Sequence, residues 1–259
     1  MRADMQKDWQ DEAWDEFIAR HWELHPVLLP APAWARFSDL SELFDIILAS
    51  RGSERLVADR FWVAKNPHPR RLDDFAMVDL DLLGPSAFDG SLEGFFSRMH
   101  GRIFGINLHR LDRWQVELRQ RLAEPVKRLS RVEGSETVRR WDIDCFLGTY
   151  RMTPFGVHRD RASVFSLCLH GERTYLTWPP DYPWPKEDLF VPDESRLKKH
   201  LHTAEQFRVR PGELFYWPSN RWHVVCSDGH PSVVVQFNAY FGPQQPVDQA
   251  GEHQEPTSG

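Results

Sequence analysis

The sequence is poor in cysteine and has no long hydrophobic run. Only three cysteines occur among 259 residues, and each lies in a short apolar stretch (Cys145, Cys168 and Cys226). This pattern is typical of buried free thiols and excludes a disulfide-stapled secreted domain. No apolar stretch approaches the ~20 residues that cross a bilayer, and the first residues, MRADMQKDWQDE, are too polar for a signal peptide. We therefore expect a cytoplasmic protein without a membrane partner.

An excess of positive charge is also lacking. The 32 Lys and Arg residues are outnumbered by 38 Asp and Glu, and the formal net charge is −6. Nucleic-acid binding relies on clustered Lys and Arg that neutralise phosphates, so the composition argues against a nucleic-acid partner. Aromatic residues, in contrast, make up 13% of the chain and include eleven Trp. Some of these rings are expected to line a pocket or a contact surface.

Residues 1–136 have the pattern of a helix-rich α+β region. Apolar residues recur at helical spacing from Trp9 to Trp22, and a short buried strand is expected at Val27 to Leu29. Further elements are predicted from capping residues and apolar runs: a helix capped by Asp39, strands over 55–65 and 75–83, a helix after Ser91, and one capped by Asp112 that Pro125 kinks or restarts.

From residue 137 onward the hydrophobic period changes to two. The apolar residues Trp141, Ile143 and Cys145 alternate with Asp142 and Asp144, and further short apolar runs follow as far as residue 241. Short strands at this density predict a sandwich, jelly roll or barrel over residues 137–242, with residues 1–136 packed on it. One insert, 186–206, interrupts the strands, and the polar tail 243–259 is predicted to be disordered.

Three residues in this β-rich half have the spacing of a metal site. His158 and Asp160 stand two apart in GVHRD, and His223 follows in NRWHVV. Residues i and i+2 of an extended segment point the same way, so the first two can face the third across a barrel. Two His and one carboxylate form the facial triad of non-haem Fe(II) oxygenases. An HxD pair by itself also fits an exposed His beside a loop carboxylate.

The surroundings of these residues resemble the cupin-like JmjC family of 2-oxoglutarate oxygenases. The stretch TPFGVHRDRASVFSLCLHGERTYLTWPP is similar to the family's first ligand strand, and RPGELFYWPSNRWHVV is similar to the second. Upstream, FIARHWELHPVLLP resembles a segment of the ribosomal-oxygenase branch. The resemblance extends from residue 17 to about 242, with no match over 55–135. It implies a double-stranded β-helix, which is a jelly roll, and an iron site made by His158, Asp160 and His223.

The resemblance also implies a co-substrate site. Arg173 stands where the family has a Lys that binds the distal carboxylate of 2-oxoglutarate, and a guanidinium can hold a carboxylate through two hydrogen bonds. The strand after the second His carries no Lys or Arg that could replace it. On that strand Gln236 and Asn238 share one face, and either can be the polar residue near the metal. Tyr150 and Thr153 are candidates for hydrogen bonds to the co-substrate, with packing at the rim as the alternative.

The resemblance implies an Fe(II)- and 2-oxoglutarate-dependent dioxygenase that uses O2 to hydroxylate an unactivated C–H bond. The expected substrate is an amino-acid side chain in a peptide or protein, or an amino-acid-derived biosynthetic intermediate. The insert 186–206 is expected at the substrate entrance. Two alternatives stay open: a cupin metalloenzyme that does not use 2-oxoglutarate, which leaves Arg173 unexplained, and a non-catalytic cupin-like binding module, which the intact triad disfavours.

Overall fold

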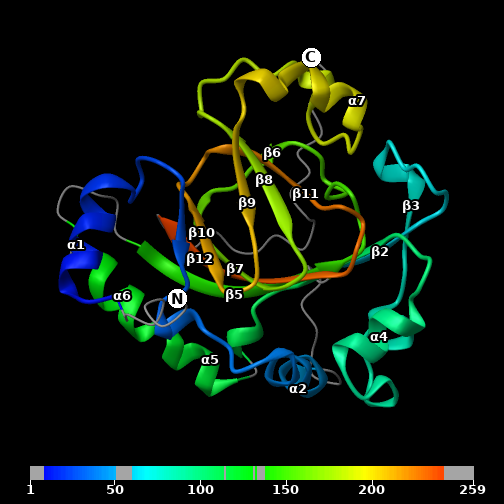
Figure 1. Cartoon of the computed structure of the whole chain (residues 1–259), viewed down its shortest axis with the longest axis horizontal. Helices are drawn as coiled ribbons and strands as arrows, with labels where there is room; N and C mark the ends of the chain where they lie inside the picture. The colour runs from blue at the N-terminus through cyan, green and yellow to red at the C-terminus, as the bar shows by residue number, and fades with distance from the viewer. Residues whose placement is uncertain (1–8, 51–59, 114, 131, 133–137, 242–259) are drawn as a thin grey trace, which may run out of the picture.

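The computed structural model describes residues 9–50, 60–113, 115–130, 132 and 138–241, so the predicted tail lies outside the described residues. Within these residues, twelve antiparallel strands form two sheets (Figure 1). Their bounds are β1 (Val27–Pro30), β2 (Arg60–Ala64), β3 (Phe75–Met77), β4 (Phe104–Leu108), β5 (Val138–Gly148), β6 (His158–Arg159), β7 (Ala162–His170), β8 (Arg173–Trp178), β9 (Glu205–Val209), β10 (Glu213–Trp217), β11 (Trp222–Cys226) and β12 (Ser232–Phe241).

The large sheet has the order β1-β10-β7-β12-β5-β4-β2-β3, and the small sheet has the order β6-β11-β8-β9. The two sheets face each other, and the predicted mainly β jelly-roll fold is confirmed. Strands from the first part of the chain extend the large sheet at both edges. Strand β1 pairs with β10 through Leu28 and Phe215, and β4 pairs with β5 through Ile106 and Leu147. The segments before and after residue 137 therefore share one sheet.

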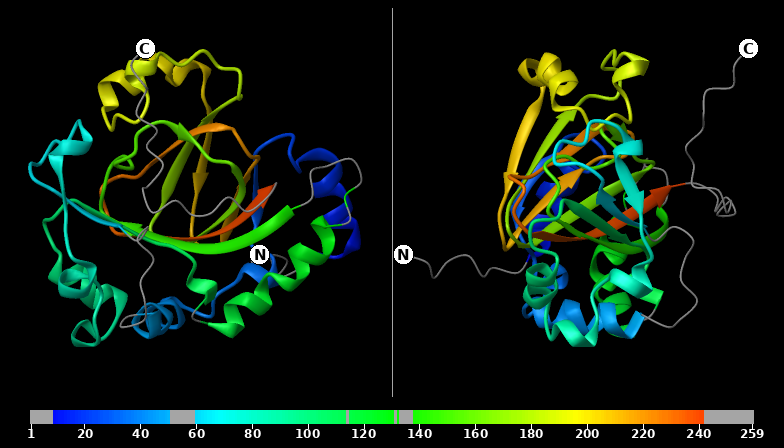
Figure 2. Two further views of the ribbon diagram at one scale, coloured as in Figure 1. Left: turned by 180° about the vertical axis from the view of Figure 1, so that it is seen from behind. Right: turned by 90° about the vertical axis from the view of Figure 1, so that its right-hand side faces the viewer.

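Helices cover the outer face of the large sheet (Figures 1 and 2). The α-helices are α1 (Asp11–Arg20), α2 (Leu40–Ser50), α3 (Leu80–Leu83), α4 (Leu92–Arg98), α5 (Val116–Arg121), α6 (Ala123–Leu129) and α7 (Glu194–Leu197). The 3-10 segments are η1 (Ala33–Ala35), η2 (Leu72–Asp74), η3 (Ala87–Asp89), η4 (Leu111–Arg113), η5 (Lys186–Asp188) and η6 (Lys198–Thr203). The segment with η5, α7 and η6 is the predicted insert, and it lies beyond one end of the small sheet (Figure 1).

Two of the predicted helix caps are confirmed by the structure. The Ser91 hydroxyl accepts a hydrogen bond from the Gly94 amide (3.0 Å) and starts α4. The Asp39 carboxylate accepts from the amides of Ser41 (2.9 Å) and Glu42 (3.1 Å) and starts α2. Both interactions satisfy amides that have no partner inside the helix.

Two other predictions for this region were wrong. The strand predicted over 75–83 ends at Met77, because the Asp79 carboxylate accepts from the Asp81 amide (2.7 Å) and caps the short helix α3. The predicted helix cap Asp112 is used elsewhere: it lies in η4, and its side chain accepts from the Ile143 amide of β5 (3.1 Å). A first helix, α5, begins later, and Pro125 lies in the first turn of a second one, α6, where a proline is tolerated.

The three cysteines are free, as expected from their number and spacing. Burial raises the pKa of Cys145 and of Cys226 to about 12 and that of Cys168 to about 11. The thiols are therefore protonated at neutral pH. Among the described residues, no helix has the length and apolar character needed to span a membrane.

Phe165 of β7 joins the large sheet to the N-terminal helix. It is fully buried, and its ring contacts those of Phe17 of α1 (5.5 Å between centroids), Trp22 (6.2 Å) and Tyr216 of β10 (4.9 Å). This cluster contains part of the aromatic stripe predicted for residues 9 to 22. It anchors the first helix on the sheet.

We expect Phe165→Ala to lower the free energy of unfolding by about 3–5 kcal/mol, because it leaves a cavity among large rings. Urea unfolding followed by circular dichroism measures the change. The matched control is Phe88→Ala, at a fully exposed position, which should change stability by less than about 0.5 kcal/mol. A similar loss for both variants would contradict the role of this cluster.

Candidate metal centre

Three potential ligand side chains converge at one end of the space between the sheets. Strand β6 carries His158, the loop after it carries Asp160, and β11 carries His223, which pairs directly with His158 in the small sheet. The ligand atoms of the three side chains all lie within 4.8 Å of one another. The His223 Nε2 atom is 3.4 Å from one Asp160 oxygen, and the His158 Nε2 atom is 3.9 Å from the other. These distances suit three ligands around one ion.

The backbone sets the tautomer of both histidines. The Nδ1 atom of His158 lies 3.0 Å from the Gly156 carbonyl oxygen, and that of His223 lies 3.1 Å from the Arg221 carbonyl oxygen. A carbonyl oxygen only accepts, so each Nδ1 carries the hydrogen and each Nε2 lone pair is free. The carbonyl groups therefore orient both rings and leave Nε2 as the metal-binding atom.

Burial favours the neutral form of His223. This side chain is only 2% exposed, and burial, followed by the neighbouring His158, lowers its pKa to about 4. At neutral pH the ring is uncharged, which is the form that binds a metal. The Asp160 carboxylate is more open, with 42% of its side chain exposed. The site is thus closed around His223 and most open at Asp160.

Arg173 points into the same interior space. On β8 it lies four residues before Thr177, which pairs with His223. Residues an even number apart on a strand share one face, so Arg173 and Thr177 point to the same side of the small sheet. Its side chain is 1% exposed. The guanidinium donates through Nε to the Ser232 hydroxyl (3.1 Å) and through Nη2 to the Phe146 carbonyl (3.0 Å). Its Nη1 atom has no hydrogen-bond acceptor among the described residues.

Tyr150 and Thr153 each carry a buried hydroxyl. Tyr150 is 3% exposed, its ring lies 5.2 Å from the Arg173 guanidinium carbon, and burial raises its pKa, so the hydroxyl keeps its proton. Thr153 is 4% exposed. In the part of the chain that the structure describes, neither hydroxyl makes a hydrogen bond. A buried hydroxyl without a partner costs free energy, so both favour a polar ligand, and that of Tyr150 lies on a side chain that contacts Arg173.

Gln236 and Asn238 both face the interior, as their spacing predicts. Neighbouring Val234 belongs to the apolar cluster between the sheets, while Val235 and Phe237 belong to the cluster under the helices. Asn238 pairs with Val164 at the triad end of β7, whereas Gln236 pairs with Ser166, two residues further from that end. Asn238 is therefore the one nearer the triad along the sheet.

Sequence reasoning missed the polar wall beside this site. Asp142 and Asp144 of β5 pair with Asn238 and Gln236 and are 3% and 4% exposed, so they face the interior rather than solvent. Asp144 accepts from the amide nitrogen of the Asn238 side chain (2.9 Å) and lies 3.1 Å from Nδ1 of His109. Burial raises the pKa of Asp142 to about 6. The regular alternation of β5 was visible in the sequence, but it did not show which face the carboxylates occupy.

Comparison with known proteins agrees with this geometry. The model of the JmjC domain family matches residues 113–244, just over half of the chain. This chain belongs to the JmjC domain family. None of the curated proteins matches the sequence.

The JmjC fold is shared with solved structures of the ribosomal oxygenase YcfD from Escherichia coli. A complex with cobalt and succinic acid aligns with a TM-score of 0.50 at 16% identity, over 89% of this chain and 52% of that chain. Another crystal structure aligns with a TM-score of 0.53 at 16% identity and the same coverage. A complex with cobalt and 2-oxoglutarate aligns with a TM-score of 0.51 at 15% identity, again over 89% and 52%. This JmjC chain thus spans about half the length of those proteins.

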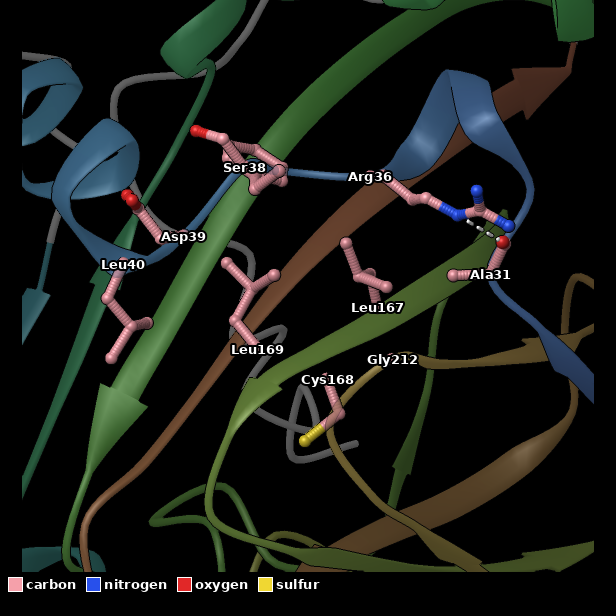
Figure 3. A pocket seen from close by; sticks show the side chains of 10 residues that line it. Ala31, Arg36, Ser38, Asp39, Leu40, Leu167, Cys168, Leu169 and Gly212 are labelled. Carbon is pink, nitrogen blue, oxygen red and sulfur yellow. Dashed lines mark hydrogen bonds between the residues drawn. The ribbon is translucent and has the colours of Figure 1, made fainter. Parts of the chain in front are cut away.

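A hollow lies on the outer face of the large sheet (Figure 3). It has a volume of about 250 Å³ and lies between Leu167 and Leu169 of β7 and the segment with Arg36 and Leu40. Both leucines belong to the helix-covered side of the sheet. The hollow therefore opens on the face opposite to the one that the JmjC triad uses.

If the triad holds the metal, His158→Ala and His223→Ala should each weaken Co(II) or Fe(II) binding more than about tenfold, because each removes one of three protein ligands. Isothermal titration under anaerobic conditions measures the dissociation constant. His230→Ala, at an exposed loop position between β11 and β12, is the matched control and should bind the metal like wild type. Unchanged affinity in both triad variants would exclude this metal site.

Proposed function

We propose that this protein is an Fe(II)- and 2-oxoglutarate-dependent dioxygenase that hydroxylates an unactivated C–H bond. The observation that carries the proposal is the convergence of two Nε2 atoms and one carboxylate in a JmjC fold. Three ligands on one side of an ion leave positions open for a co-substrate and O2. When bound, the iron together with 2-oxoglutarate and O2 supplies the oxidising power for the reaction.

The donor set beside the triad fits the co-substrate. On β8, Arg173 lies four residues from the partner of His223, which is about 13 Å along a strand. A long Arg side chain and a five-carbon diacid can together bridge this span, with one carboxylate at Arg173 and the keto acid end at the metal. The Nη1 atom of Arg173 and the hydroxyls of Tyr150 and Thr153, which make no hydrogen bond within the described residues, are the donors proposed for the distal carboxylate.

In this proposal the protein residues position and shield the reacting groups. The carbonyl groups of Gly156 and Arg221 hold the two imidazoles with Nε2 inward. Arg173 binds the charge of the co-substrate, and the buried interior excludes water around it. Asn238, oriented by Asp144, is proposed to hydrogen-bond near the metal, with Gln236 deeper in the same row.

The proposed substrate is an amino-acid side chain in a peptide or protein. The solved structures with the same fold are of a ribosomal oxygenase, which supports this class. An amino-acid-derived intermediate is the second candidate, because the buried polar wall with Asp142 and Asp144 could bind a small polar molecule. The protein is proposed to act in the cytoplasm, where its free thiols stay reduced.

The insert 186–206 is proposed to border the substrate entrance. Leu189 forms a parallel β-bridge with Val157, and the Phe190 amide donates to the Val157 carbonyl (3.1 Å). Val157 immediately precedes His158, so the insert touches the segment that carries the first ligand. Trp184, just before the insert, packs its ring against that of His200 within it, with 4.2 Å between the ring centroids.

An anaerobic titration tests the proposed function. Addition of Fe(II) and then 2-oxoglutarate should produce a weak visible absorption band that requires both compounds. The same titration of His223→Ala is the control and should produce no band. A cupin metalloenzyme of another type would bind iron without the band, and a binding module would bind neither compound, so either result would contradict the proposal.

We expect Arg173→Gln to weaken 2-oxoglutarate binding by about one to two orders of magnitude, because it removes a charge-assisted pair worth about 1.5–3 kcal/mol. Metal affinity should stay near that of wild type, which distinguishes the loss from unfolding. The matched control is Arg208→Gln on β9, whose side chain is 62% exposed and pairs with Glu172. Equal 2-oxoglutarate affinity of the two variants would assign the role to another residue.

A further inference from the structure

The two chain segments that carry Asp160 and His223 meet at a junction outside the metal site. Asp160 lies in the loop between β6 and β7, and His223 follows the turn between β10 and β11. The Asn220 amide of that turn donates to the Asp160 carbonyl (2.7 Å), and the Ser219 amide donates to the Ser163 hydroxyl (3.0 Å). The backbone positions of two ligands are therefore coupled through the contacts between these segments.

The carboxylate of Glu23, which is far from both segments in the sequence, binds to them at this junction. One of its oxygens accepts from the hydroxyls of Ser163 and Tyr216, the latter at 3.2 Å, and is 3.4 Å from the Ser219 amide. The other oxygen accepts from the Ser219 hydroxyl (2.6 Å). The Glu23 amide in turn donates to the Tyr216 hydroxyl (2.9 Å). One side chain thus binds both segments and strand β10 at once.

Glu23 reaches the junction from the helix-covered face of the large sheet. Ser163 pairs with Ala239, which belongs to the cluster under the helices, while the next residue, Val164, belongs to the interior cluster. Glu23 is therefore no metal ligand.

Among the four non-glycine residues with positive φ in the described ranges, two lie at this junction, Glu23 (56°) and Asn220 (57°). Such backbone is costly for Glu23, less so for Asn220, and it persists where surrounding contacts require it.

Two of the groups that donate hydrogen bonds to the Glu23 carboxylate are buried. Burial, and next the charge of Glu23, raise the pKa of Tyr216 well above its usual value, so its hydroxyl stays a donor. Ser163 and Tyr216 are fully buried. The Asp160 side chain, in contrast, is 42% exposed and sits on a two-residue loop between β6 and β7, so its own packing does little to fix it. The hydrogen bond from the Asn220 amide is the contact that ties the Asp160 backbone to the junction.

We propose that Glu23 is a positioning residue for the metal centre: through Ser163 and Ser219 it holds the loop of Asp160 and the turn before His223 at the separation that a metal ion needs. The inference rests on the proposed function, because it assumes that these side chains bind iron. It gives the segment after the first helix a role in metal affinity. Loss of the Glu23 carboxylate lets the two segments move apart and weakens metal binding in a protein that is still folded.

Metal affinity of folded variants tests this inference. Co(II) is titrated into wild type, Glu23→Ala and Glu23→Gln at a temperature where circular dichroism shows each to be folded. We expect about tenfold weaker binding for Glu23→Ala, the size of effect seen when groups that orient metal ligands are removed. The Co(II) affinity of Glu23→Gln should lie between those of wild type and Glu23→Ala. Gln keeps one acceptor oxygen, and the serine hydroxyls can rotate to accept from its amide. The visible spectrum of bound Co(II) reports whether its coordination has changed.

A double-mutant cycle separates positioning from general stability. In a Ser163→Ala/Ser219→Ala background, Glu23→Ala should weaken Co(II) binding less than twofold further, because its route to the ligands is already broken. Glu16→Ala is the matched control: this exposed residue pairs with Arg20 on α1, and its loss should leave Co(II) affinity unchanged.

The outcomes distinguish the inference from the proposed function. If Glu23→Ala and Glu23→Gln both melt at lower temperature but bind Co(II) within twofold of wild type, Glu23 only stabilises the fold and the inference is wrong. An equally large loss in both backgrounds would also overturn it. If instead His158→Ala binds Co(II) as tightly as wild type, the metal site itself is wrong, and the proposed function fails independently of Glu23.

Discussion

The large sheet is buried on both faces, and the rest of the structure depends on the register of its central strand. On β12, Val233, Val235 and Phe237 pack under the helices, whereas Val234 and Asn238 face the space between the sheets. Side chains alternate along a strand, so a slip by one residue would move polar groups into the helix layer and apolar groups into the site. The pairing of β12 with β5 and β7 therefore decides which side chains pack under the helices and which face the space between the sheets.

The three side chains of the candidate metal centre lie on short segments. Strand β6 has only two residues, and Asp160 follows it in a loop. The imidazoles are oriented by backbone carbonyls two residues before each of them, which is a local effect. The spacing between the segments, in contrast, comes from the pairing of His158 with His223 and from the hydrogen bond between Asn220 and Asp160. Ligand geometry thus combines local orientation with long-range spacing.

Much of the β-rich half could be predicted because its signals are local. The short apolar runs expected as far as residue 241 end in strand β12, whose last residue is Phe241, and the alternation around Ile143 marks β5. The two wrong predictions, the strand over 75–83 and the Asp112 helix cap, concern short stretches of sequence that fit more than one local structure. Asp79 and Asp112 both follow apolar residues and can cap a helix, but only Asp79 does so. Asp112 binds the Ile143 amide, a partner 31 residues away that no local pattern indicates.

The sequence by itself determined the type of fold, the three candidate ligands and the position of Arg173, because strand alternation, HxD spacing and motif order are written in short stretches of chain. Tertiary structure alone decided which polar residues face the interior and what holds the ligand segments. Asp142 and Asp144 became buried because β5 lies between β12 and β4 with the small sheet opposite. Glu23 bonds to Ser163 and Ser219 across 140 and 196 residues. The packing of whole elements determines which residues so far apart become hydrogen-bond partners, and no local sequence pattern predicts them.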